Sequence, residues 1–163
     1  MRRSGRGAAI LLAANALSFA ALSPAMADGS VDAPARNGTV QELETDMQIT
    51  VIAQQATLVY DLNESTAAKE LYAQLPMDIE VENYGGIEKI FYPPRKLETA
   101  DTPLARSVQA GTLAYYAPWG DVVMFYDSFR PAPGLYELGQ IVSGREDIEV
   151  LSGTIRIEKS GGQ

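Results

Sequence analysis

From Met47 onward, the chain contains short stretches in which apolar and polar residues alternate. An alternation with a period of two residues is typical of β-strands that bury one face. Six such stretches predict strands, and they cover residues 47–53, 57–62, 77–83, 87–92, 135–142 and 154–158. Residues 112–117 and 121–126 are apolar and rich in aromatic residues instead, and they predict two further strands that face each other across a Pro-Trp-Gly turn. Glycine and proline punctuate several of the junctions, which is typical of antiparallel strands joined by turns.

One segment has helical rather than strand spacing. Its apolar stripe consists of Ala68, Leu71, Tyr72 and Leu75. Asn63 or Ser65 is predicted to cap the first turn, and Pro76 ends the helix. A helix of about ten residues is marginal on its own in water, so we expect it to pack on a sheet.

These elements predict a mainly all-β fold. A closed eight-stranded barrel capped by one α-helix buries the pattern best, because closure removes exposed strand edges. A β-sandwich is the alternative. The long loop over residues 93–110 has no periodicity, and loops of this length in compact domains are often functional.

Asp78, Glu80 and Glu82 share one face of the strand predicted over residues 77–83. Three carboxylates at this spacing are compatible with a divalent cation, but the glycine-bent geometry of a calcium loop is missing. We therefore interpret them as a solvated strand face and predict no metal site.

The first 27 residues predict a secretory signal peptide. Three arginines precede a mainly apolar stretch over residues 8–22, and Ala25 and Ala27 fit the site that a signal peptidase reads. The stretch is shorter than the roughly 20 apolar residues that cross a bilayer. Residues 28–45 predict a flexible tether, and residues 46–160 the folded domain. We expect export to the periplasm or the medium, without stable membrane insertion after cleavage.

Composition narrows the chemistry. Loss of the three signal-peptide arginines changes the net charge from −8 to −11, and the remaining basic residues are scattered, which argues against a nucleic-acid partner. The chain has no cysteine and therefore no disulfide or lipid-modified cysteine. It has no histidine, which excludes Ser-His-Asp and Cys-His pairs and histidine-based metal sites. We predict no cofactor.

The order of the motifs is informative. An Asn-x-x-Thr-Ala helix start at residues 63–67 precedes Tyr-Gly-Gly-Ile-Glu-Lys at 84–89 and Tyr-Tyr-Ala-Pro-Trp-Gly-Asp at 115–121, and Gly-Leu, Leu-Gly and Ser-Gly pairs follow within 134–144. Over nearly all of residues 49–159 this order resembles the bacterial cyclophilin-like family of small, mostly uncharacterised proteins. The resemblance implies a cyclophilin-type eight-stranded barrel, but it implies no activity.

True cyclophilins are peptidyl-prolyl isomerases, and their motif places an arginine two residues after a phenylalanine, followed by a Gln-Gly-Gly stretch, with a histidine on a loop. Here Phe91 is separated from Arg95 by residues 92–94, and neither Gln-Gly-Gly nor histidine occurs. We therefore expect no conventional isomerase activity. A divergent isomerase that uses a loop arginine, such as Arg95, Arg106 or Arg130, is the alternative.

Aromatic residues concentrate at predicted strand ends and turns, where rings often line ligand grooves. Trp119 fits a barrel plug or an exposed anchor equally well. Glu88 and Lys89 are adjacent on a strand and must face opposite sides, so they are not predicted to form a catalytic pair. The predicted ligand-binding residues are Tyr84, Arg95, Tyr116, Trp119, Phe129, Arg130 and Tyr136.

The favoured function is an exported, noncatalytic module that binds a peptide or a small ligand, and we assign no catalytic residue. A structural role as an envelope partner is a further alternative, which a large apolar surface patch would favour. The oligomeric state is not predicted.

Overall fold

The structure is a computed structural model that describes residues 47–161. The predicted signal peptide (residues 1–27) and the predicted tether (residues 28–45) lie outside the described residues. None of the helices in the described part of the chain is long and apolar enough to cross a membrane.

The described residues form eight strands, one α-helix and one short 3₁₀ helix. The strands are β1 (Gln48–Ile52), β2 (Thr57–Leu62), β3 (Met77–Tyr84), β4 (Glu88–Phe91), β5 (Thr112–Tyr116), β6 (Asp121–Phe125), β7 (Leu135–Ser143) and β8 (Gly153–Lys159). The helices are α1 (Thr66–Ala73) and η1 (Arg145–Asp147). Each strand begins and ends within one residue of the position that the sequence predicts.

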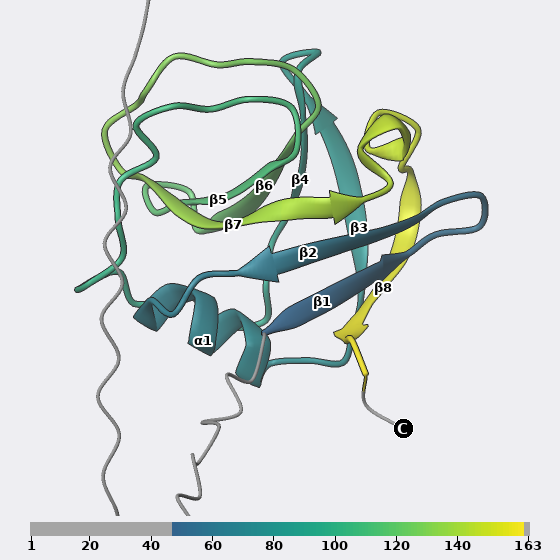
Figure 1. The fold of residues 1–163 in the computed structure, drawn as a ribbon, viewed down its shortest axis with the longest axis horizontal. Helices are drawn as coiled ribbons and strands as arrows, with labels where there is room; N and C mark the ends of the chain where they lie inside the picture. Colours follow the sequence, from purple (N-terminus) through teal and green to yellow (C-terminus); the bar gives the residue numbers. More distant parts are fainter. Residues whose placement is uncertain (1–46, 162–163) are drawn as a thin grey trace, which may run out of the picture. The chain divides into compact units, whose positions relative to one another are not determined.

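The strands pair antiparallel and close into a barrel in the order β1-β2-β7-β5-β6-β4-β3-β8 (Figure 1). This confirms the predicted eight-stranded barrel and rules out the β-sandwich. Its interior is filled by alternating strand side chains, among which Leu58, Tyr60, Leu113 and Tyr115 are at most 1% exposed. Ala67, Ala68 and Leu71 of α1 belong to the same apolar cluster, so the helix packs on the barrel core as expected.

Both residues that were predicted to cap α1 contribute to its start. The Ser65 hydroxyl oxygen accepts a hydrogen bond from the Ala68 N–H at 3.4 Å. Asn63 Oδ1 accepts from the Ser65 N–H at 3.1 Å, and Asn63 Nδ2 donates to the Glu137 carbonyl of β7 at 2.7 Å. The cap therefore ties the helix start to the barrel wall.

Replacing Ser65 with alanine is expected to lower the free energy of unfolding by about 1 kcal/mol, because it removes the side-chain acceptor at the helix N-cap. Urea denaturation followed by circular dichroism measures the change. Glu64→Ala is the control, since it removes only an exposed ion pair with Lys69 and should cost less than about 0.5 kcal/mol. Equal losses in the two variants would contradict the capping role.

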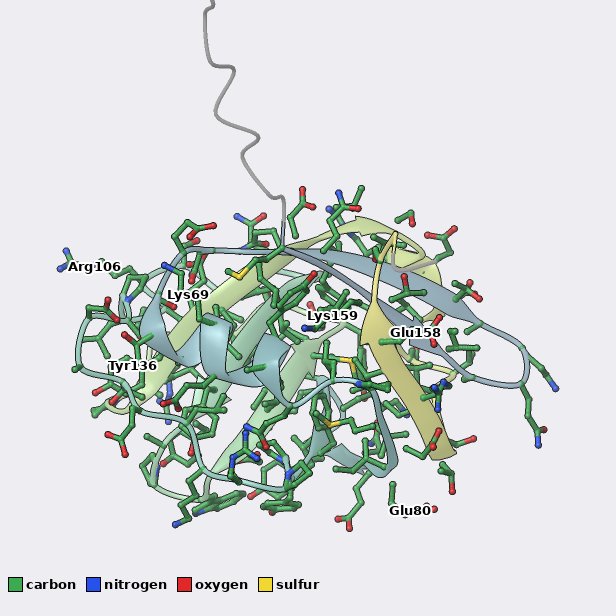
Figure 2. The ribbon with its side chains drawn as sticks, turned by 90° about the horizontal axis from the view of Figure 1, so that it is seen from below. Lys69, Glu80, Arg106, Tyr136, Glu158 and Lys159 are labelled. Carbon is green, nitrogen blue, oxygen red and sulfur yellow. The ribbon has the colours of Figure 1, made fainter. Side chains whose placement is uncertain are left out.

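The acidic face of β3 is paired with β8. Arg156 Nη1 lies 3.2 Å from Asp78 Oδ2, and the Thr154 hydroxyl contacts the Glu80 carboxylate. Glu80 lies at the edge of the molecule in the view of Figure 2. Within residues 47–161, no group of three or more Asp, Glu, His or Cys side chains is arranged to hold a metal ion.

The strands β4, β5 and β6 are buried on both faces, which the sequence did not predict. Their outward side chains form a second apolar cluster against the loops over residues 93–110 and 127–134. Its buried members are Ile90, Ala105, Val108, Ala114, Val123, Phe125 and Leu135. The loop over 93–110 is fastened there by a hydrogen bond from the Ala105 N–H to the Leu135 carbonyl at 2.9 Å. The covered outer face of the barrel is where the candidate site lies.

Candidate functional site

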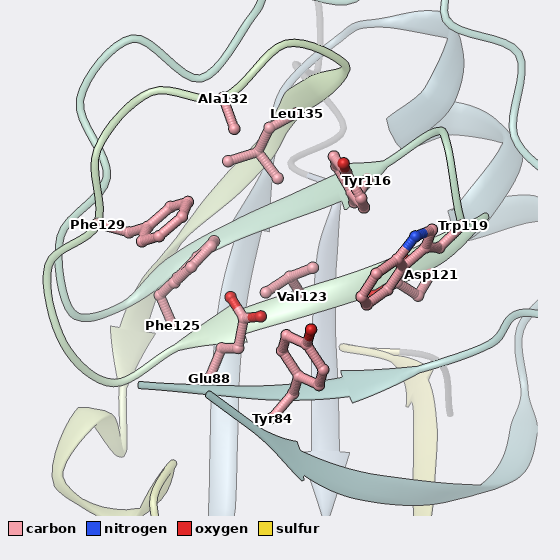
Figure 3. Close-up of a pocket in the computed structure, with 10 residues that line it drawn as sticks. All are labelled: Tyr84, Glu88, Tyr116, Trp119, Asp121, Val123, Phe125, Phe129, Ala132 and Leu135. Atoms are coloured by element: carbon pink, nitrogen blue, oxygen red, sulfur yellow. The ribbon is translucent and has the colours of Figure 1, made fainter. Parts of the chain in front are cut away.

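A cavity of about 220 Å³ opens on the outer face of the barrel (Figure 3). It lies over β4, β5 and β6, beside the loop over residues 127–134. Its lining consists of Tyr84, Glu88, Tyr116, Trp119, Asp121, Val123, Phe125, Phe129, Ala132 and Leu135. Most of these side chains are apolar or aromatic, and two are carboxylates.

Strand register brings these side chains together from distant parts of the chain. Tyr84 of β3 is opposite Glu88 of β4, and Glu88 is in turn opposite Phe125 of β6. Tyr116 of β5 is opposite Asp121 of β6. Directly opposed residues on neighbouring strands place their side chains on the same face of the sheet. The first row on the outer wall is therefore Tyr84, Glu88 and Phe125, and the second is Tyr116 and Asp121.

Aromatic rings stand at two ends of the cavity. Trp119, in the turn between β5 and β6, makes edge-to-face contacts with Tyr84 and Tyr116 at centroid distances of 5.2 and 5.5 Å. At the other end Phe125 and Phe129 stack at 6.0 Å. Trp119 is 47% exposed and is therefore an accessible wall of the cavity and not a barrel plug.

The turn that carries Trp119 requires a glycine. The N–H groups of Trp119 and Gly120 both donate to the Tyr116 carbonyl, at 3.2 and 2.8 Å. Gly120 has φ +80°, a left-handed conformation that glycine adopts without steric cost. The turn therefore holds the indole beside the first residue of β6, which is Asp121.

Asp121 is a buried carboxylate at the wall of this cavity. Asp121 is 2% exposed, and its Oδ1 atom has no hydrogen-bond partner among the described residues. Burial raises the pKa of its carboxyl group, because the charged form loses its hydration. An unpaired buried polar atom is unusual in a folded protein, and a donor from a ligand or an ordered water would pair it.

Glu88 of β4 lines the same cavity and is partly buried. Burial, followed by the nearby charge of Asp121, raises the pKa of Glu88 to about 7. Neither carboxylate makes an ion pair within the described residues. Lys89, the next residue along β4, faces the other way, with its Nζ 5.8 Å from the Tyr126 ring centroid. The two carboxylates are suited to receive a hydrogen-bond donor or a cation, and Glu88 can also exchange a proton near neutral pH.

The structure brings some of the predicted ligand-binding residues together and separates others. Arg95 is beside α1, where its N–H donates to Gln74 Oε1 at 2.8 Å. Arg130 is exposed and lies outside the lining, and so does Tyr136 on β7, whose ring lies near the edge of the molecule (Figure 2). Arg106 is exposed too. The predicted residues that line the cavity are Tyr84, Tyr116, Trp119 and Phe129.

Glu88 and Asp121 were not among the ligand-binding residues predicted from the sequence. The positions of Glu88 and Asp121 within their strands do indicate which face of the sheet their side chains occupy. Glu88 has the same parity as Ile90 on β4, and Asp121 has the same parity as Val123 and Phe125 on β6. A carboxylate at the end of an otherwise apolar strand face is a candidate site residue once that face is known to be covered.

The comparisons with known proteins concern the fold. Residues 51–158 match the sequence profile described as the cyclophilin-like family, which confirms the resemblance seen in the sequence. A solution structure of the hypothetical protein AF2241 from Archaeoglobus fulgidus is similar, with 19% identity over 74% of this chain and 99% of that chain and a TM-score of 0.55. No curated protein sequence matches significantly.

A second similar structure is that of McbB in complex with tryptophan. It is 15% identical, over 71% of this chain and 45% of McbB, with a TM-score of 0.53. The chain thus matches less than half of McbB. At these identities the two likenesses show the fold alone.

Proposed function

This chain belongs to the cyclophilin-like family, and on that premise we propose that it is an exported binding protein that takes an aromatic small molecule into the cavity on the outer face of its barrel. The family fold does not specify an activity, so the proposal depends on the cavity. The observation that carries it is the exposed indole of Trp119, held edge-on by two tyrosines at the opening of an apolar cavity.

The lining supports an aromatic ligand. Val123 and Leu135 provide an apolar surface, and rings stand on either side of it. Aromatic pairs contribute about 0.5–1.5 kcal/mol beyond the area that they bury. The volume of about 220 Å³ is small beside the roughly 300–1,000 Å³ of ordinary ligand pockets, which favours a compact molecule over an extended peptide.

The cavity favours binding over isomerisation. An isomerase needs a cation or a hydrogen-bond donor close to the prolyl amide. The charged side chains among the lining residues are both carboxylates, which accept hydrogen bonds when they are ionised. Neither Arg95 nor Arg130 is part of the lining.

Binding can be tested with two neutral probes, 2-phenylethanol and the indole alcohol tryptophol. Trp119 is the single tryptophan of the chain, so its fluorescence reports directly on the cavity during titration with 2-phenylethanol. We expect a saturable change with a dissociation constant of about 1 mM or below, which corresponds to about −4 kcal/mol. Isothermal titration calorimetry with tryptophol provides a second measurement.

Trp119→Ala is expected to weaken tryptophol binding at least about tenfold, because aromatic anchors at the centre of a site carry much of the binding energy. The control is Tyr136→Ala, which removes a predicted site residue that lies outside the lining. Circular dichroism checks that both variants are folded. The proposal is wrong if the unmodified protein binds neither probe, or if the two variants bind tryptophol equally well.

A further inference from the structure

Two carboxylates in the wall of an aromatic cavity restrict what the cavity can hold. We infer that its ligand carries a protonated amine, which Glu88 and Asp121 receive while the aromatic part of the ligand lies against the rings. This inference rests on the proposed function, and it further specifies that the aromatic ligand is positively charged.

The first argument is the unpaired oxygen of Asp121. The residue is 2% exposed, and its Oδ1 is buried without a partner among the described residues. A carboxylate oxygen can only accept hydrogen bonds, so the missing partner is a donor. Buried polar atoms in folded proteins are almost always paired, and an ammonium group brought by the ligand supplies up to three N–H donors.

The second argument is charge. The residues opposite Glu88 on the neighbouring strands are Tyr84 of β3 and Phe125 of β6, and the nearest charge that acts on it in the cavity is the Asp121 carboxylate. None of them is positive. Lys96 packs beside Gly120, but no ion pair joins it to either carboxylate in the part of the chain that the structure describes. A cation between Glu88 and Asp121 would relieve their mutual repulsion, whereas an anionic ligand would increase it.

The third argument is the aromatic lining. The face of an aromatic ring carries partial negative charge and attracts an ammonium group, most strongly for tryptophan and tyrosine. The rings of Trp119, Tyr84 and Tyr116 line the same cavity as the two carboxylates (Figure 3). Trp119 is only two residues before Asp121 in the sequence. Carboxylates and electron-rich rings thus favour the same kind of ligand group, and the apolar end of the cavity at Phe129 and Leu135 accommodates the rest of the molecule.

The test compares three probes of similar shape and different charge: 2-phenylethylamine, 2-phenylethanol and 3-phenylpropanoate. Each is titrated into the purified protein at pH 8, with Trp119 fluorescence as the readout. We expect the amine to bind at least about tenfold more tightly than the alcohol, and the carboxylate to bind more weakly than either.

Glu88→Gln and Asp121→Asn are expected to reduce the ratio of amine to alcohol affinity to about threefold or less, because each removes one charge with little change of shape. Glu82→Gln is the matched control. It removes an exposed carboxylate of β3 that lies outside the lining, so the ratio should remain at least about tenfold. A similar fall in this control would assign the preference to the general negative charge of the protein and would overturn the inference.

The outcomes separate the two proposals. Equal affinity for amine and alcohol, with saturation of the Trp119 signal, overturns the ammonium inference and leaves the proposed function standing. Tighter binding of 3-phenylpropanoate than of the amine does the same. Failure of all three probes to bind overturns both.

Discussion

Replacing Gly139 with alanine is expected to lower the free energy of unfolding by about 3 kcal/mol, the upper end of the usual cost of overpacking. Gly139 lies in β7, opposite Leu62 of β2 and Leu113 of β5. A Cβ atom on Gly139 would overlap the Asp61 carbonyl oxygen. Because that oxygen belongs to the backbone of a paired strand, the contact can only be relieved by moving β2 away from β7, which opens the barrel.

Urea denaturation followed by circular dichroism measures this effect. Val142→Ala is the control on the same strand, since Val142 is 53% exposed and its truncation should cost about 0.5 kcal/mol or less. If Gly139→Ala unfolds at the same urea concentration as the unmodified protein, β2 and β7 do not approach each other as closely as the structure has them.

Replacing Glu88 with glutamine is expected to raise the free energy of unfolding at pH 8 and to leave it nearly unchanged at pH 4. The pKa of Glu88 rises from 4.5 to about 7 on folding, so the folded protein holds more protons than the unfolded chain between these values. Stability therefore falls as the pH rises through this window, and the full cost is present above pH 7. The neutral amide of glutamine does not carry this cost.

The expected gain at pH 8 is about 2 kcal/mol. The whole shift corresponds to about 3 kcal/mol, and water that reaches the partly buried side chain screens some of it. Urea denaturation at the two pH values provides the measurement, and Glu82→Gln, which changes an exposed side chain of β3, should change stability by less than about 0.5 kcal/mol at either pH. A loss of stability in Glu88→Gln at pH 8 would show that the ionised carboxylate is favourably paired in the folded protein.

This second prediction links stability to the proposed site. Functional residues often lower stability, and a bound ligand that pairs with the ionised Glu88 would supply the missing stabilisation. The variant should therefore be more stable than the unmodified protein and bind amines less well. A gain in stability together with a loss of amine affinity is not expected for a residue whose only role is packing in the core.

The strands of the barrel were predictable because their patterns are local. Most of the strands show an alternation of apolar and polar residues over a few positions. The observed bounds of β2, Thr57–Leu62, are those that this alternation predicts. The helix start was predictable for the same reason, since Ser65 caps through an atom only three residues away. The aromatic residues at the turn, above all Trp119, were also identified from their place between two strands.

The sequence by itself thus determined the strands, the capping helix and part of the aromatic wall, and it favoured the barrel over the β-sandwich. The tertiary structure alone decided that Glu88 and Asp121 share a cavity and that Arg95, Arg130 and Tyr136 lie outside it. The alternation shows which residues share a strand face, but not whether that face meets water. Here the answer depends on loops far away in the chain, such as the one held by the hydrogen bond from Ala105 to Leu135, and on strand pairing between β4 and β6.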